Sequence, residues 1–305
     1  KNTPYLEPLA LLLANLSIII AAFFFRKVIG RYTNEIWIIN AATLIVFLGT
    51  PIWAYGRMLF TEAFLISFSL TAYWIAIEKK SGFWPGVLLS LGMFMKPSFA
   101  FLFFQLYALL LAKKKWGNIF RMSIGPALVS LFYFYFNNKI FGSPFHFSQC
   151  FSLGKTTLLG TAASGVDVYP LGITGIWKIW ISWNHGIITF LPIVVPVLFS
   201  WKRFFEEKTN EAWIWGGGFV CYYLFMTSCV PWEGGWCYGP RQIMPVITFL
   251  MIPVFYNLKS FSNSKRWVQW VFIVLCLLSI CFNALGAMDG YWVSHPLTIL
   301  KGNVS

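Results

Sequence analysis

The sequence predicts an all-α, polytopic membrane protein with about ten transmembrane helices, for two reasons. First, only 11% of the 305 residues are charged and 58% are hydrophobic, whereas about 25% of the residues of a soluble protein are charged. Second, apolar stretches that approach the roughly twenty residues needed to cross a bilayer recur along the whole chain. We expect residues 1–305 to form a single transmembrane domain, because no soluble domain interrupts these stretches.

Six predicted spans precede a long polar segment, and four follow it. Each span is rich in aliphatic and aromatic residues and ends at a charged, Gly-containing or Pro-containing segment. Several spans are shorter than twenty residues, as tilted helices with polar ends can be. The ten spans cover residues 9–25, 36–54, 58–77, 84–95, 99–112, 122–136, 187–200, 212–230, 243–258 and 268–287.

The polar segment, residues 139–186, is predicted to be a long extracytoplasmic loop, because Gly and Pro interrupt it repeatedly. Near its end, Trp177, Trp180 and Trp183 recur every three residues, which places them on one face of a helix. The spacing predicts a short helix lying in the membrane interface, where Trp prefers to sit. An aromatic belt at the end of the next span explains the same residues equally well.

Basic residues alternate between the loops, and this alternation predicts the orientation of the chain. Lys and Arg accumulate in cytoplasmic loops, so the net charge of +13 does not indicate a nucleic-acid partner. The loops after the odd-numbered spans are therefore predicted to be cytoplasmic, and both ends of the chain to lie outside the cytoplasm. These loops hold fifteen of the 23 basic residues: Arg26, Lys27, Arg31, Lys79, Lys80, Lys113, Lys114, Lys115, Arg121, Lys202, Arg203, Lys208, Lys259, Lys265 and Arg266.

A second group of ionisable residues, together with aromatic residues, lies at the extracytoplasmic ends of the spans, opposite the basic loops. Ionisable groups at membrane depth are costly and usually functional. Here they come from several distant segments and are predicted to converge on one side of the membrane. They are Arg57, Glu62, Lys96, His146, His185, Trp232, Glu233, Trp236, Tyr238 and Arg241.

Several motifs that contain or adjoin these residues resemble those of the GT-C superfamily of multispan glycosyltransferases. This superfamily includes protein O-mannosyltransferases and the aminoarabinose transferases of lipid A. The motifs are RMLFTEAF, GMFMKPS, NNKIFGSP, WNHGIITFLP and WEGGWCYGPRQIMPVITFLMIP. Their order, spacing and common side carry the resemblance, which covers most of the chain.

The resemblance implies an enzyme of the bacterial plasma (inner) membrane with an extracytoplasmic active face. Such enzymes move a sugar from a polyprenyl-phosphate donor to a lipid, glycan or protein acceptor. Their catalytic Asp lies in the first outer loop, and no residue here matches it, since Glu7 is the one acid near the start. We therefore expect the catalytic carboxylate, with one span and part of a loop, upstream of residue 1.

Cations are the first requirement of such a site, because a lipid phosphate needs positive charge and directional donors. Arg241, Lys96 and Arg57 are the candidate phosphate-binding residues. Alternatively, each cation snorkels to lipid headgroups or caps a helix. Tyr238, Trp232, Trp236, His185 and His146 are candidate substrate contacts, although the residues around 232–241 also suit a tight turn with belt aromatics.

Two carboxylates complete the predicted site, and both have alternative roles. Glu62 and Glu233 are possible catalytic contributors, since a carboxylate helps to deprotonate an acceptor hydroxyl. Glu62 is also the candidate ligand for a divalent cation, Mg or Mn, because hard cations take oxygen ligands. It is alternatively a salt-bridge partner of Arg57 or Lys96, and Glu233 alternatively a solvated loop acid.

Three rival functions remain open at this point. A transporter or flippase of lipid-linked saccharides shares apolar spans and outer cations, but such proteins often carry charges near the bilayer midplane. A polymerase or ligase of surface glycans is also multispan with long outer loops. A non-catalytic subunit of a membrane complex is the third. The cysteines show no CxxC motif. Cys229 and Cys237 bracket the stretch Trp232 to Trp236 and would be able to form a disulfide if that side of the membrane is oxidising.

Overall fold

The computed structural model describes residues 6–56, 61–79, 81–144, 173–182, 186–228 and 239–289. The fold is 86% helical and has no strand among these residues, which confirms the predicted all-α class. The helices are α1 Leu6–Ile29, α2 Ile36–Leu48, α3 Ile52–Gly56, α4 Glu62–Glu78, α5 Phe83–Met95, η1 Pro97–Phe99, α6 Ala100–Ala112, α7 Trp116–Phe141, α9 Ile173–Ile181, α10 Ile187–Phe190, α11 Val194–Glu207, α12 Thr209–Ser228, η2 Arg241–Ile243, α13 Met244–Tyr256, α14 Leu258–Ser262 and α15 Arg266–Asp289.

Within the described residues each predicted span coincides with helical structure, but two of them are broken at a proline. The stretch 36–54 divides into α2 and α3 around Pro51, and the stretch 187–200 divides into α10 and α11 around Pro192. Proline lacks the backbone N–H and disfavours the helical conformation of the residue before it. Leu191 accordingly has φ −133° and ψ 68°. Both breaks follow from prolines inside apolar runs that hydropathy alone reads as continuous.

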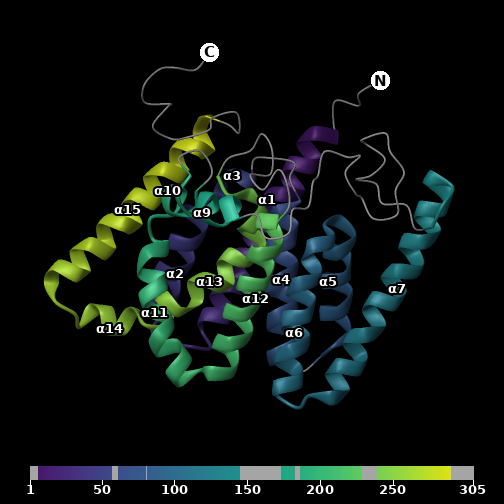
Figure 1. Ribbon diagram of the computed structural model, residues 1–305, viewed down its shortest axis with the longest axis horizontal. Helices are drawn as coiled ribbons and strands as arrows, with labels where there is room; N and C mark the ends of the chain where they lie inside the picture. Colours follow the sequence, from purple (N-terminus) through teal and green to yellow (C-terminus); the bar gives the residue numbers. More distant parts are fainter. Residues whose placement is uncertain are drawn as a thin grey trace.

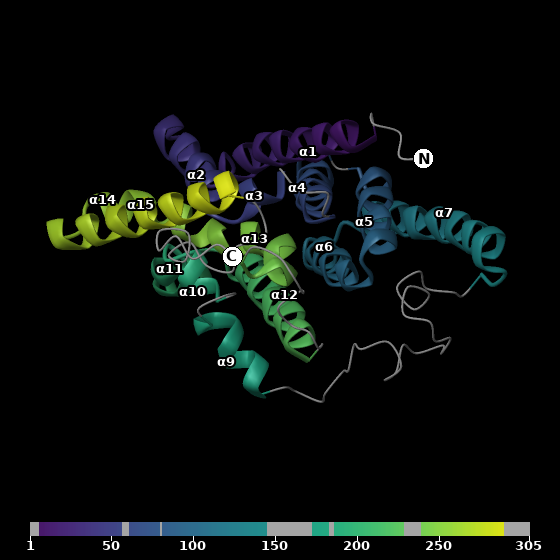
Figure 2. The same ribbon diagram turned by 90° about the horizontal axis from the view of Figure 1, so that it is seen from above.

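The apolar helices of membrane-spanning length are consistent with membrane association, but they do not confirm ten spans. Of the described helices, three are long and apolar enough to cross a bilayer, namely Pro8–Ile29, Trp116–Ile140 and Arg266–Met288. Ile36–Leu48, Phe83–Met95, Ala100–Ala112 and Arg241–Tyr256 are apolar but shorter. In Figures 1 and 2, α7 and α15 lie at opposite edges of the molecule. Their outward faces carry exposed large apolar residues, as a lipid-facing surface does.

The core is built around α13, whose residues from Met244 to Phe255 are all buried. Trp215 of α12 stacks on Phe249 of α13 with ring centroids 4.6 Å apart, and Tyr73 of α4 meets the Trp215 ring edge-on at 4.8 Å. Such aromatic contacts add to the free energy gained by burial. These contacts join α4, α12 and α13 in the centre of the molecule and so fix the positions of α4 and α13 relative to each other.

The five basic loops lie together at one end of the helices, as their alternation in sequence predicts. Arg31 Nη1 lies 2.8 Å from Glu78 Oε1, which joins the first loop to the second. Ion pairs and a hydrogen bond supply the remaining links between loops: Lys259 Nζ to Glu35 Oε1 at 3.1 Å, Lys113 Nζ to Glu211 Oε1 at 2.6 Å, and Tyr32 Oη to Glu211 Oε2. The α6–α7 and α11–α12 turns share this end in Figure 1, whereas α1 begins at the opposite end.

Glu211 is the hub of this basic end. Burial alone would raise the pKa of its carboxyl, but hydrogen bonds from Lys113 and Tyr32 and the charges of Lys113 and Arg31 hold the pKa below its usual value. The charged form is therefore the one that the fold stabilises.

The predicted short helix near the end of the polar segment is present as α9. One side of α9 packs against α12: the Trp180 ring lies 6.0 Å from that of Tyr223, whose hydroxyl donates to the Ile176 carbonyl. Trp177 instead is 65% exposed. The two Trp side chains therefore do not share one environment, and Trp183 lies outside the described residues.

Candidate functional site

Three of the predicted site residues are described, and the structure brings all three together. Glu62, Lys96 and Arg241 begin α4, follow α5 and begin η2, respectively. They lie at the end of the molecule opposite the basic loops, because Glu62 and Glu78 are the two ends of α4. The other candidates lie outside the described residues: Arg57, His146, His185, Trp232, Glu233, Trp236 and Tyr238, together with Cys229 and Cys237.

One carboxylate oxygen holds both cations. Glu62 Oε1 accepts a hydrogen bond from Arg241 Nε at 2.9 Å and another from Lys96 Nζ at 3.2 Å. These partners are 179 and 34 residues away from Glu62 in the sequence. The salt bridge to Lys96, one of the two roles that the sequence left open for Glu62, is therefore present.

Burial differs between the acid and the two cations. The Glu62 side chain is 0% exposed, whereas Lys96 is 14% and Arg241 23% exposed. A buried carboxylate is tolerated only when it is paired. The carboxylate is thus more deeply buried than either of the cations that pair with it.

Lys96 is positioned by the end of α5. It precedes Pro97, and its extended conformation, φ −150° and ψ 108°, ends the helix there. The chain then turns back, so that the Phe99 ring packs on Gly92, where a Cβ would lie 2.1 Å from the ring. A side chain at position 92 would displace the Phe99 ring, so the glycine allows the chain after Lys96 to pack closely on α5.

Arg241 is positioned by a left-handed turn at Gly239. Gly239 has φ +67°, and a Cβ there would lie 3.1 Å from Pro51 and 3.2 Å from Phe190. The Arg241 N–H donates to the Gly239 carbonyl at 2.8 Å, which closes the turn. The two proline-broken stretches thus meet at the glycine that aims Arg241, since Pro51 precedes α3 and Phe190 ends α10.

A second, uncharged link ties the two cation-bearing segments together. The Tyr222 hydroxyl donates to the Gln242 carbonyl at 2.9 Å and lies 3.4 Å from the Ser98 hydroxyl. Ser98 and Gln242 are close in sequence to Lys96 and Arg241. Sequence reasoning missed Tyr222, because a tyrosine in an aromatic-rich helix gives no signal of its own, whereas Ser98 stands within the GMFMKPS motif.

The charges of the three described residues sum to +1, which favours an anion. Among the described residues, no donor lies within hydrogen-bonding distance of Glu62 Oε2. A divalent cation fits this arrangement poorly, because Oε1 already serves two cations whose charges would repel a metal ion. The described residues also contain no cluster of three or more His, Cys, Asp or Glu side chains.

Comparisons of the chain with known protein families, with curated proteins and with solved structures found no match. Function is therefore argued from the site itself.

Proposed function

We propose that the chain is a membrane glycosyltransferase that moves a sugar from a polyprenyl-phosphate donor to a lipid, glycan or protein acceptor. The proposal rests on one observation, which is that Lys96 and Arg241 meet on the buried carboxylate of Glu62. Two cations brought together from distant segments, with more positive than negative charge, are suited to an anionic headgroup. Their place at one end of the helix bundle suits a headgroup at the membrane surface.

The two cations would favour the reaction as well as binding. In the transfer, the bond between the sugar C1 and the phosphate oxygen breaks, and a bond forms between C1 and the acceptor oxygen. The leaving polyprenyl phosphate gains negative charge as the first bond breaks. Lys96 and Arg241 interact more strongly with this charge than with the intact donor, and such differential stabilisation lowers the barrier.

Glu62 serves in this proposal as a positioning residue. Its bonds to both cations hold them in place before the donor arrives, so less reorganisation is needed on binding. The same bonds make it a poor general base, because a carboxylate paired with two cations has little affinity for a proton. The base that takes the proton of the acceptor hydroxyl is not assigned, and no step is routed through a metal ion.

The proposed sidedness follows from the basic loops. Loops rich in Lys and Arg face the cytoplasm, and the Glu62 site lies at the other end of the helices. We accordingly propose that the site faces the extracytoplasmic side of a bacterial plasma membrane.

The test is sugar transfer by the protein expressed from its whole gene and reconstituted into liposomes. Radiolabelled polyprenyl-phosphate sugars are supplied with a membrane extract as the source of acceptors, and label that leaves the polyprenyl lipid is measured. Arg241→Ala and Lys96→Ala should each lower transfer at least about 100-fold, the range found when a single charge-stabilising donor is removed from an enzyme. Lys265→Ala, at the basic end, is the matched control and should leave transfer unchanged.

Normal transfer by either site variant would remove that residue from the site. If the labelled lipid crosses the bilayer and no sugar is transferred, the chain is a flippase and the transferase proposal is wrong.

A further inference from the structure

A recess opens at the basic end of the molecule, between α1, the loop that follows it, α2 and α4. Its volume is about 630 Å³, which lies within the range of ligand pockets. Its charged lining consists of four cations and one carboxylate: Arg26, Lys27, Arg31, Lys79 and Glu78. The described lining therefore carries a net charge of about +3, far more than the Glu62 site.

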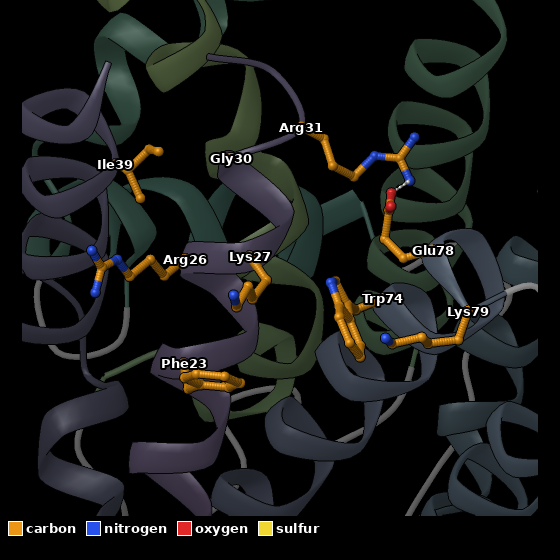
Figure 3. A pocket seen from close by; sticks show the side chains of 9 residues that line it. All are labelled: Phe23, Arg26, Lys27, Gly30, Arg31, Ile39, Trp74, Glu78 and Lys79. Carbon is orange, nitrogen blue, oxygen red and sulfur yellow. Dashed lines mark ion pairs between the residues drawn. The ribbon is translucent and has the colours of Figure 1, made fainter. Parts of the chain in front are cut away.

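Three of the four cations of this recess are held in place by their neighbours. Lys27 Nζ lies 5.5 Å from the centroid of the Phe23 ring, and Lys79 Nζ lies 5.3 Å from that of Trp74. Figure 3 shows Lys79 reaching toward Trp74, and Arg31 reaching toward Glu78. Cation–π contacts restrict the ammonium groups without neutralising them. The tendency of loops to be basic accounts for the number of cations here but not for their arrangement around one cavity.

An apolar stripe on α1 leads into the recess. Leu16, Ile20 and Phe23 are exposed and recur at intervals of four and three residues, and Lys27 continues the same face one turn later. Phe23 and Lys27 line the recess itself. Because α1 is one of the three helices able to span a bilayer, this stripe is suited to contact with an acyl chain.

We propose that the recess binds the phosphate headgroup of an anionic phospholipid, whose acyl chain lies along the stripe on α1. Basic pockets between helices at a membrane surface bind the headgroups of such lipids. The continuous passage from cations to exposed apolar residues favours a lipid over a soluble phosphate compound. The site lies at the opposite end from Glu62, and the proposal does not depend on the transferase function.

The test measures lipid binding to the purified full-length chain in nonionic detergent by native mass spectrometry. Phosphatidylglycerol should bind, and phosphatidylcholine with the same acyl chains should bind much more weakly. The double variant Lys27→Gln, Lys79→Gln should weaken phosphatidylglycerol binding about 25-fold, which is roughly fivefold for each cation removed. The matched control, Lys202→Gln with Lys265→Gln, removes two exposed lysines of the same end that do not line the recess.

The control should bind phosphatidylglycerol within about twofold of the unchanged chain, because neither lysine lines the recess and exposed charges away from it are screened by salt. Its charge change equals that of the recess variant, so the comparison separates the recess from overall charge. Equal losses in the two double variants would overturn the proposal, because binding would then reflect overall charge. Equal affinity for phosphatidylcholine would overturn it too. Displacement of the lipid by millimolar sodium phosphate would assign the recess to a soluble phosphate instead. Each of these results leaves the sugar-transfer assay unaffected, so the two proposals fail separately.

Discussion

At the scale of single residues, we expect the charge of Glu62 to contribute strongly to the stability of the fold. Glu62 is a fully buried acid whose Oε1 accepts from two cations that are themselves partly exposed. Removing one partner of a buried ion pair costs more than the pair contributes, because the remaining charge is left uncompensated. Here two cations would lose their counter-ion at once.

Glu62→Gln should therefore lower the free energy of unfolding by about 3 kcal/mol. Thermal unfolding of the purified protein in detergent measures the change. Glu78→Gln is the matched control, because Glu78 ends the same helix and pairs with Arg31 while 43% exposed. Its loss should cost less than about 1 kcal/mol. Equal destabilisation by the two substitutions would contradict the structural weight that we give to Glu62.

The sequence predicted that Glu62, Lys96 and Arg241 would converge, because charges are rare in this chain and alternate between its two ends. It did not predict which atoms would pair. Arg57 and Lys96 are equally acceptable partners of Glu62 from the sequence, and a bond between Glu62 and Arg241 was not predicted. Pairing depends on how the end of α5 and the turn before η2 are bent, and tertiary packing at Gly92 and Gly239 sets those bends.

At the scale of elements, α5 and α7 approach each other closely at glycine residues. A Cβ on Gly86 would lie 2.1 Å from the Met122 carbonyl oxygen, and one on Gly125 would lie 2.3 Å from the Gly86 carbonyl carbon. Gly82, at the start of α5, is as close to Asn118. Small residues four apart let helix backbones approach in this way inside membranes. The peripheral helix α7 is thus attached to α5 through backbone contact at these glycines and, further along, through ring contacts of Phe94 with Tyr133 and Phe136.

Gly86→Ala should consequently loosen α7, since its methyl group meets backbone that cannot move aside without separating the helices. We expect a loss of about 2 kcal/mol or more in the free energy of unfolding, measured by thermal unfolding. Gly117→Ala, on α7 itself, is the control, because a Cβ at that position meets nothing within 4 Å. It should be neutral or slightly stabilising. Gly86→Ala with unaltered stability would show that α7 can shift at no cost.

The positions of the helices were predictable, because apolar runs and basic loops mark them. Where a helix is broken, and which helices pack against each other, were not predictable. The breaks at Pro51 and Pro192 lie inside runs whose hydropathy is uniform. Gly82 and Gly86 form a spacing that the sequence contains, but one chain of sequence does not say which helix faces it. Contact between segments far apart in the chain is decided by the whole set of packing choices.

At the scale of the whole molecule, the two ends differ in charge and in construction. One end gathers the five basic loops and their cross-linking ion pairs. The other gathers the helix breaks, the Glu62 site and the left-handed turn at Gly239. A protein built in this way is expected to sit in a bilayer with its basic end toward the cytoplasm.

Cysteine labelling tests this orientation. In a cysteine-free background, Lys139→Cys, at the end of α7 remote from the basic loops, should react with a membrane-impermeant maleimide added outside cells. Lys202→Cys should react only after the cells are opened. Both lysines are exposed, so their reagent access depends on the membrane alone. Labelling of both positions from the same side would refute the proposed orientation.

The sharing of one oxygen between Lys96 and Arg241 has a further consequence. Because both cations bond to the same oxygen, substitution of either one changes the electrostatic surroundings of the other. The two positions are therefore coupled, and the effects of substituting them should not be additive.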